Sequence, residues 1–456
     1  MQGRAFTVGE FGRRHHPSMK SGGWSWLPEP GVRDFFRRAT FMGVGCGIAS
    51  MSNWDWKDMR GCVFPWGINY PNELVPKQVA RDWRNLAIFF RSFEPKHVPE
   101  DLVYVIPDQF LLGGRQSEME KRIQLSLDAL STTNIPFSVI RQYELPNLKA
   151  APPKAILFPL PYTLSDAEVT LLADFAREGS TVYLSGDMTY DANRQPARPQ
   201  VLETLCGVKL KSRRYPDIRR AGDPAPAFAG KPEQYDAYPS LELAGQSNVL
   251  IRHAVGKGQV LFLNDPIELH ADRETLRKVY THLIELPPIS HEKDVLAYHL
   301  PTVAGELRLL LNEGKETVTT DLAKARFTIP AGSQVAVHTS GTSAITALAT
   351  DGAASLGTPF ADGAGRKLIL SLDGKALDRS DAILVLPLGE GELKLGRDLP
   401  VAVGEIVDGR WRAYETLASS RDVPITELRS TAFLLLCPTD QRDRWTKAIE
   451  TLVTQP

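Results

Sequence analysis

Glu10 stands near the start of the chain in a setting typical of a catalytic carboxylate. It directly follows the short apolar run Ala5 to Gly9, which predicts a buried strand, and Gly12 comes two residues later. In (β/α)8 barrels the catalytic groups lie at the carboxyl ends of such strands. The alternative is a surface or capping glutamate in a turn. Taken alone, Glu10 fits this alternative better, and the matching strand end of the next βα unit shifts the balance towards the catalytic interpretation.

A second group of candidates, Asn53-Trp54-Asp55-Trp56-Lys57-Asp58, ends the next apolar run along the chain, Met42 to Met51. Indole rings suit the floor of a sugar subsite because the flat apolar faces of pyranose rings pack on them. We therefore expect the two tryptophans to line such a subsite and Asp55 or Asp58 to bind sugar hydroxyls. In the alternative interpretation, the tryptophans pack under the loop and the acids cap the next element.

Tryptophan is concentrated in the first hundred residues, which contain all eight tryptophans of the chain except Trp411 and Trp445. Three of the nine histidines lie there as well. This composition is typical of a sugar-binding cleft, and a tryptophan-rich core is the alternative. In the cleft interpretation Trp24 also lines the site, and His15 contacts sugar hydroxyls unless its loop is merely solvated.

Two βα units must position these residues. The strand that ends before Glu10 is followed by a helix over 28–41 with apolar residues at helical spacing. The apolar run 42–51 comes next, and a second amphipathic helix covers 76–93. The predicted order is strand, helix, strand, helix.

The middle of the chain continues to alternate strands with helices. Capping boxes at Ser117 and Ser165 predict two helix starts, and a further helix is expected over 272–284. This alternation predicts a parallel sheet covered on both faces, of flavodoxin-like type. The expected strands cover 102–108, 136–140, 155–160, 181–187 and 258–266.

Beyond Pro287, short apolar runs separated by Gly and Asp turns predict a β-sandwich, closed by an amphipathic helix over 440–453. The expected organisation is therefore an α/β multidomain chain. Residues 1–98 hold the two βα units, residues 99–288 the flavodoxin-like domain, and residues 289–456 the β-sandwich with its terminal helix.

The two strand ends together resemble the last two βα units of a clan-A glycoside hydrolase barrel. In that clan the nucleophilic glutamate ends the seventh strand, commonly in a Gly-Glu-Phe-Gly-like sequence, and an aromatic residue ends the eighth. Glu10 in Gly9-Glu10-Phe11-Gly12 and Trp54 in Ser52-Asn53-Trp54-Asp55 match these positions. A barrel followed by a flavodoxin-like trimerisation domain and a small β-domain is similar to family 42 β-galactosidases. The spelling around Glu10 is nearer to family 5.

The resemblance implies retaining hydrolysis of β-glycosides by double displacement, with Glu10 as nucleophile. A second carboxylic acid, about 5 to 5.5 Å away, would serve as acid and base. In the clan that acid follows an Asn on the fourth strand, well upstream of the nucleophile. The two Asn-Glu pairs of this chain, Asn72-Glu73 and Asn312-Glu313, lie downstream of Glu10. The acid/base is therefore expected to be missing from the chain.

Two barrel units cannot close a barrel, so we expect this chain to be the C-terminal part of a longer hydrolase and inactive alone. The alternative is a non-catalytic module with a vestigial barrel, which contacts carbohydrate and assembles. A glycoside substrate and a homo-oligomer formed through the flavodoxin-like domain are the expected partners.

Composition narrows the remaining function classes. The chain has 456 residues, 43% of them hydrophobic, and its 53 Lys+Arg balance 54 Asp+Glu. This excludes a disordered chain and leaves no basic surplus for nucleic acid, so the cluster of Arg213, Arg214, Arg219 and Arg220 is interpreted as a solvated or interface loop.

No cofactor, metal site or membrane span is expected. The four cysteines, Cys46, Cys62, Cys206 and Cys437, show no metal-ligand spacing. No apolar run approaches the ~18 residues of a membrane span, and no export signal is recognised, which makes a cytoplasmic location the default expectation.

Overall fold

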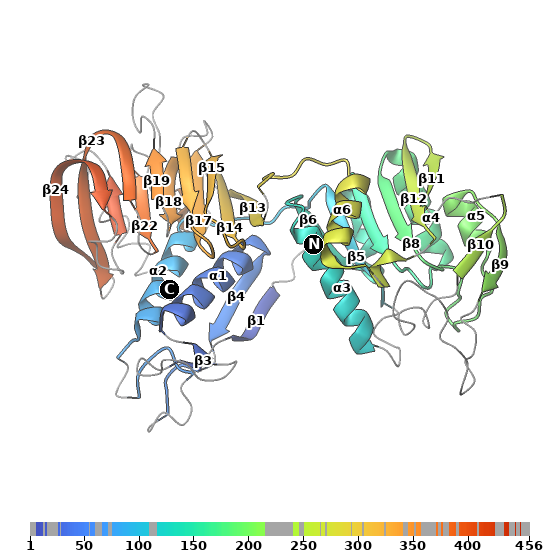
Figure 1. Cartoon of the computed structure of the whole chain (residues 1–456), viewed down its shortest axis with the longest axis horizontal. Helices are drawn as coiled ribbons and strands as arrows, with labels where there is room; N and C mark the ends of the chain where they lie inside the picture. The colour runs from blue at the N-terminus through green and yellow to red at the C-terminus, as the bar shows by residue number, and fades with distance from the viewer. Residues whose placement is uncertain are drawn as a thin grey trace. The chain divides into compact units, whose positions relative to one another are not determined.

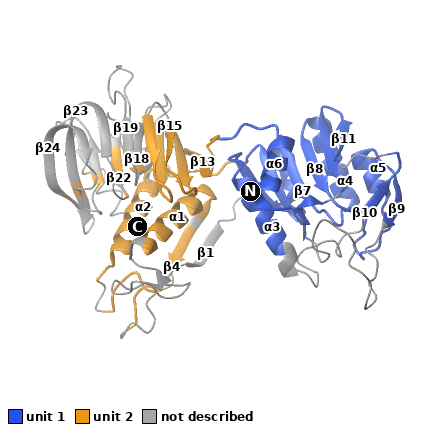
Figure 2. Ribbon diagram, in the orientation of Figure 1, with its two compact units in different colours: residues 1–2, 99–289 blue, residues 3–98, 290–456 orange. Residues whose placement is uncertain are grey.

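In the computed structural model the chain forms two compact units (Figure 2). Unit 1 consists of residues 1–2 and 99–289, and unit 2 of residues 3–98 and 290–456. The first and last of the three expected domains thus fall in one unit. The structure describes residues 6–11, 14–15, 26–27, 29–53, 55–59, 66–71, 75–108, 116–214, 240–245, 250–264, 266–269, 271–292, 294–302, 305–322, 325–340, 345–350, 353–356, 371–372, 375–376, 383–388, 392–407, 410–424, 433–436, 443 and 447.

Unit 1 is built on a six-stranded sheet whose parallel strands are short apolar runs in the sequence (Figure 1). The sheet order is β6-β5-β7-β8-β12, with antiparallel β11 at the edge beside β12. In chain order the parallel strands read 2-1-3-4-5, the order of flavodoxin-type sheets. The strands are β5 (Leu102–Ile106), β6 (Phe137–Arg141), β7 (Ala155–Pro159), β8 (Thr181–Ser185), β11 (Leu250–Val255) and β12 (Gly258–Leu263).

Successive residues of each strand point to opposite faces, and each face has its own core. Val103 and Val105 pack with α4 (Asp166–Glu178) and α5 (Gln200–Cys206). Leu102 and Tyr104 pack on the other face with α3 (Gln116–Ser131) and α6 (Arg273–Leu283). Because helices cover both faces, the strands are apolar almost throughout, which is why the sequence identified them.

The predicted helix starts of unit 1 have different outcomes. The capping box at Ser165 is confirmed, because Ser165 Oγ accepts from the Glu168 amide while the Glu168 carboxylate accepts from the Ser165 amide. Helix α3 begins at Gln116, so Ser117 lies inside its first turn and is not its N-cap. Two 3-10 helices, η3 (Gln142–Ala150) and η5 (Ile267–Leu269), follow β6 and β12.

The stretch between β8 and β12 contains elements that the sequence did not predict. They are α5, the antiparallel pair β9 (Leu210–Arg214) and β10 (Ser240–Leu243), and β11. For β11 the reason is local composition. This strand carries Arg252 and His253 and buries only Ile251 fully, so its sequence lacks the apolar run of an inner strand.

Unit 2 begins with two parallel strands, β1 (Phe6–Phe11) and β4 (Ile48–Asn53), joined through α1 (Glu29–Gly45). Helix α2 (Gln78–Arg91) follows, so the predicted strand-helix-strand-helix order is observed. The expected apolar run 42–51 is divided, since its first residues complete α1 and only β4 is a strand. Two short strands in the connection, β2 (Arg14–His15) and β3 (Trp26–Leu27), pair in parallel.

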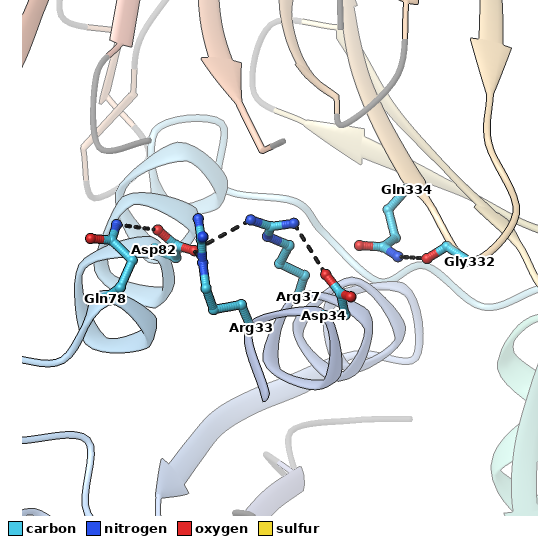
Figure 3. A network of polar contacts seen from close by, with 7 residues as sticks. All are labelled: Arg33, Asp34, Arg37, Gln78, Asp82, Gly332 and Gln334. Carbon is cyan, nitrogen blue, oxygen red and sulfur yellow. Dashed lines mark hydrogen bonds and ion pairs between the residues drawn. The ribbon is translucent and has the colours of Figure 1, made fainter. Parts of the chain in front are cut away.

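An ionic network joins α1 to α2 (Figure 3). Asp82 on α2 accepts from Arg33 Nε at 2.5 Å and from Arg37 Nη2 at 3.4 Å, while Gln78 donates to its other oxygen at 2.9 Å. Arg37 also pairs with Asp34 at 3.3 Å. Since Arg37 and Asp82 are both buried, this network fixes how the two helices lie against each other.

The helix pair packs on the sheet that forms the rest of unit 2 (Figure 1). Phe41 of α1 and Leu86, Phe89 and Phe90 of α2 share one core with Leu309 of the sheet. The three phenylalanines meet edge to face, with ring centroids 5.3 and 5.5 Å apart. The N-terminal βα units and the C-terminal strands are therefore a single packed body.

Eleven of the described C-terminal strands pair as one mixed sheet. The richness of this part in strands is observed, and the β-sandwich expected for residues 289–456 stays a prediction. Most pairs are antiparallel, but β18–β22 and β19–β23 are parallel, and the long strand β23 joins both halves. Hairpin spacing in a sequence cannot reveal such long-range pairing. The strands are β13 (Val295–Thr302), β14 (Gly305–Asn312), β15 (Val318–Leu322), β16 (Ala325–Ile329), β17 (Gln334–Ser340), β18 (Ile345–Thr350), β19 (Ala353–Leu356), β22 (Ile383–Pro387), β23 (Glu392–Val407), β24 (Arg410–Pro424) and β25 (Phe433–Leu436).

Two further features complete unit 2. A separate hairpin is formed by β20 (Ser371–Leu372) and β21 (Lys375–Ala376). The predicted terminal helix over 440–453 lies outside the described residues, apart from the helical positions 443 and 447.

Candidate functional site

Glu10 lies near the carboxyl end of β1, beside the end of β4. Val8 pairs with Met51 and Phe11 with Asn53, with a register shift between the two pairs. Because the strands are parallel, Glu10 and the segment after Asn53 emerge at the same edge of the sheet. The backbone thus brings together the two predicted strand ends. The side chain of Glu10 lies outside the described part of the chain.

The segment after β4 is held in a small ladder. Residues 55–58 run beside residues 66–69, and Asn69 in turn bridges to Pro76. The Asp55 amide donates to the Trp66 carbonyl at 3.1 Å, and the Asn69 amide donates to the Trp56 carbonyl at 3.1 Å. We call residues 55–59, 66–71 and 75–77 the shelf loop.

Trp56 is exposed on the shelf loop although its backbone is fixed. Its side chain is 59% exposed, while the Asn69 side chain donates a second hydrogen bond to its carbonyl at 2.8 Å. Its amide donates to Asp55 Oδ1 at 2.6 Å. The expectation that Trp56 packs under the loop is therefore wrong, and an indole face is available for a ligand.

Asp58 does not bind a ligand's hydroxyl groups. Its side chain is fully buried, as is that of Lys77, and Lys77 Nζ lies 2.7 Å from Asp58 Oδ2. This corrects the interpretation that made Asp55 and Asp58 equal candidates. Asp55 is only half-buried and keeps its place as a candidate. Lys77 was missed because a lysine just before a helix carries no sequence signal of a buried partner.

The other predicted site residues are placed only in part. His15 lies in β2, where it pairs with Leu27, and its side chain lies outside the described residues. Trp24 and Trp54 lie wholly outside them. The structure therefore brings Glu10, Asp55 and Trp56 to one edge by their backbones and leaves the contribution of His15, Trp24 and Trp54 as a prediction.

The second Asn-Glu pair has a structural role. The buried Asn312 side chain donates to the carbonyls of Glu316 at 2.8 Å and Ile329 at 2.9 Å. Glu313 forms an ion pair with Arg38 of α1. These contacts tie a turn of the sheet to the helix, as expected for a pair that is not an acid/base. Asn72 and Glu73 lie outside the described residues.

Unit 1 contains a buried carboxyl that the sequence did not single out. Glu268 of η5 accepts hydrogen bonds from Tyr183 at 2.7 Å, Ser185 at 2.9 Å and Tyr280 at 3.2 Å. Burial raises the pKa of Glu268 above its usual value. All four side chains are buried, so the cluster lacks the access that a catalytic site requires.

The basic cluster of unit 1 is partly a structural feature. Arg213 Nε forms an ion pair with the buried Asp187 at 3.1 Å, and Arg213 Nη2 donates to the Thr189 hydroxyl group. The interpretation of Arg213 as part of a solvated loop is therefore wrong. Arg219 and Arg220 lie outside the described residues.

The described residues contain neither a metal-binding cluster nor a membrane-spanning helix. They contain no group of three or more His, Cys, Asp or Glu side chains able to hold a metal ion. No described helix is long and apolar enough to cross a membrane.

Comparison with known proteins adds a fold to this geometry. No sequence-family profile and no curated protein matches the chain. A β-galactosidase from Bacillus circulans sp. alkalophilus matches 74% of this chain and 55% of its own, with 14% identity and a TM-score of 0.52. A cold-adapted β-galactosidase from Rahnella sp. R3 matches 72% and 54%, with 16% identity and a TM-score of 0.53. Gan42B, a GH42 β-galactosidase from G. stearothermophilus, matches 73% and 50%, with 14% identity and a TM-score of 0.51.

In fold, this chain resembles part of a GH42 β-galactosidase. The resemblance to family 42, drawn from the expected order of domains, is confirmed at the level of the fold. The chain spans about half the length of these enzymes.

Proposed function

We propose that this chain carries part of the active site of a retaining glycoside hydrolase that acts on β-glycosides. Residues 1–98 supply the last two βα units of its barrel, with Glu10 as nucleophile. Residues 99–288 form a flavodoxin-like domain that assembles a homo-oligomer, and residues 289–456 form the β-domain. The observation that carries the proposal is that the strand end of Glu10 lies beside the end of β4, three residues before the exposed Trp56, in a parallel pair of a GH42-like fold.

The lack of buried side chains along β4 supports a larger barrel. None of its described side chains is buried, although parallel strands are normally covered on both faces. Further βα units, in the same polypeptide or in a separate one, would cover this strand and supply the acid/base. A glycosidase barrel built in this way would place the shelf loop at the mouth of its cleft.

The proposed chemistry is double displacement. The Glu10 carboxylate attacks the anomeric carbon, and the bond to the leaving oxygen breaks as the acid/base donates a proton to it. The same group then removes a proton from water, which attacks the anomeric carbon and releases Glu10. Trp56 would bind the apolar face of a sugar, and Asp55 a hydroxyl group. Trp24, Trp54 and His15 complete the proposed binding set.

The test is nucleophile replacement in the chain expressed together with the coding sequence upstream of Met1. Turnover of 2,4-dinitrophenyl β-galactoside is expected to fall by about 10³-fold or more in Glu10→Ala. Sodium azide should restore turnover, because azide attacks the anomeric carbon from the vacated side and dinitrophenolate leaves. The product would be a glycosyl azide of inverted configuration.

Glu29→Ala, at the start of α1, is the matched control and should retain wild-type turnover. Wild-type-like turnover by Glu10→Ala would remove Glu10 from the mechanism. A product of retained configuration in the azide reaction would also contradict its role as nucleophile.

A second candidate function is a non-catalytic module that contacts carbohydrate and assembles. The exposed Trp56 favours it, since a binding surface requires no acid/base. Sedimentation of residues 99–289 tests the assembly role, and a strict monomer at micromolar concentration would count against it. Galactan binding without turnover by the full assembly would favour the module over the enzyme.

A further inference from the structure

A fully buried ion pair lies in the shelf loop, two residues after the exposed indole. The side chains of Asp58 and Lys77 are both 0% exposed, and Nζ lies 2.7 Å from Oδ2 and 2.9 Å from Oδ1. Removing two charges from water is costly, and a buried pair often contributes no more stability than apolar residues of the same size. The structural consequence of this pair is therefore its geometry.

Two further hydrogen bonds of the pair go to the shelf loop itself. Asp58 Oδ1 accepts from the Gly67 amide at 2.9 Å, and Lys77 Nζ donates to the Gly67 carbonyl at 2.7 Å. One ion pair thus fastens all three segments of the loop. The backbone at Gly67 is packed so closely that a Cβ there would lie 2.2 Å from the Lys57 carbonyl carbon.

Lys77 also breaks a local rule of helix formation. It is the N-cap of α2, where Ser, Thr, Asp or Asn is preferred, and it makes no side-chain cap. A positive charge at a helix N-terminus is unfavourable to the helix dipole. Lys77 is unfavourable for the start of its helix but is paired with Asp58. Such conflicts between local preference and tertiary structure are expected at functional sites, so we infer that Lys77 serves the shelf loop.

We propose that Asp58 and Lys77 are positioning residues that hold the shelf loop so that the Trp56 indole stands outward as a flat surface for a pyranose ring. The sugar ligand rests on the proposed function, whereas the mechanical role does not. A fixed backbone with an outward ring lowers the ordering cost of binding. Met59 and Val75 on the same loop are also exposed, at 55% and 50%.

The test replaces both charges together, since a single replacement would leave the other charge buried and unpaired. Asp58→Leu/Lys77→Met keeps the volume of the pair and removes its bonds to Gly67. The matched control in the same unit is Asp321→Leu/Arg326→Met, which removes an exposed ion pair on β15 and β16. Trp56→Ala reports the contribution of the indole alone.

Two readouts separate positioning from stability. Hydrogen exchange should show loss of protection at the amides of Asp58 and Asn69 in the double variant, with the melting temperature within a few degrees of wild type. Retardation in gels that contain β-1,4-galactan should weaken by about 10-fold, as in Trp56→Ala. The control pair should change neither readout.

Wild-type amide protection and galactan affinity in Asp58→Leu/Lys77→Met would overturn the proposal. If that variant does not fold, Gly67→Ala decides, because it shifts the loop and keeps both charges. Weakened galactan binding by Gly67→Ala would support positioning, and unchanged binding would overturn it. If the wild-type protein does not bind galactan, the proposed sugar ligand is wrong. The protection of the Asp58 and Asn69 amides then decides whether the ion pair holds the loop, and unchanged protection in the double variant would overturn that role.

Discussion

At the scale of single residues, Glu268 is a buried carboxyl group that has no positively charged partner among the described residues. Its hydrogen-bond donors are the hydroxyl groups of Tyr183, Ser185 and Tyr280, and the Tyr280 hydroxyl continues to Ser126 at 2.5 Å. Burial raises the pKa of Glu268, and the hydroxyl donors offset this only in part. The folded state therefore favours the protonated acid.

This predicts a pH dependence that Glu268→Gln removes. Because the folded pKa lies above the ordinary 4.5, the stabilisation is complete below pH 4.5 and is lost as pH rises toward the folded pKa. The loss is at most about 1.4 kcal/mol per pH unit. Urea unfolding of both proteins from pH 4 to pH 8 measures it. A wild-type slope that persists in Glu268→Gln would show that another group is responsible.

The candidate site shows how far residue patterns reach. The strand-end position of Glu10 and the local concentration of tryptophan were enough to select the edge where β1 and β4 end. They could not distinguish Asp55 from Asp58, because the partner of Asp58 is Lys77, nineteen residues along the chain. The full burial of Asp58 and the half-burial of Asp55 follow from tertiary contacts that adjacent residues do not encode.

At the scale of elements, the helix pair of unit 2 packs on the sheet through aromatic side chains and a buried histidine. The His338 ring of β17 stacks on Phe93, which follows α2, with centroids 4.3 Å apart. Its Nε2 lies 2.9 Å from Thr302 Oγ1 of β13. Burial lowers the pKa of His338 to about 3, so this junction requires the neutral ring.

Acid is therefore expected to weaken the helix–sheet junction through His338. The folded pKa lies below the ordinary 6.5, so stability is complete above pH 6.5 and is lost as pH falls toward 3. Between pH 6.5 and 4.5 this amounts to about 2.5 kcal/mol. Urea unfolding at the two pH values should show a smaller difference for His338→Gln than for wild type. Equal differences would assign the acid sensitivity elsewhere.

Helices and strands differ in whether the residues next to one another in the sequence are enough to predict them. The parallel strands of unit 1 and both helices of the βα units follow from apolar runs and helical spacing, and they were predicted. The edge strand β11 and the pair β9–β10 were not, because edge positions admit polar residues. Strand β23 joins the two halves of the eleven-stranded sheet through contacts between distant segments. The spacing of turns in the sequence carries no information about such contacts.

At the scale of the whole molecule, the chain contains two units with separate cores. The pKa shifts of the buried carboxyl groups of unit 1 and of the buried histidine of unit 2 have opposite directions. In unit 1 burial raises the pKa of Glu100 and Asp108 as well as that of Glu268. In unit 2 burial lowers the pKa of His338. Raising the pH thus weakens unit 1 and strengthens unit 2.

We therefore expect two unfolding transitions that move in opposite directions with pH. Differential scanning calorimetry at pH 5 and pH 8 should show the transition of unit 1 at a lower temperature at pH 8 and that of unit 2 at a higher one. Residues 99–289 expressed alone should reproduce the first transition, because that unit contains its own two-faced core. A single transition, or two that shift together, would contradict separate folding units. If Glu268→Gln and His338→Gln each flatten the pH shift of one transition only, the two transitions are assigned to their units.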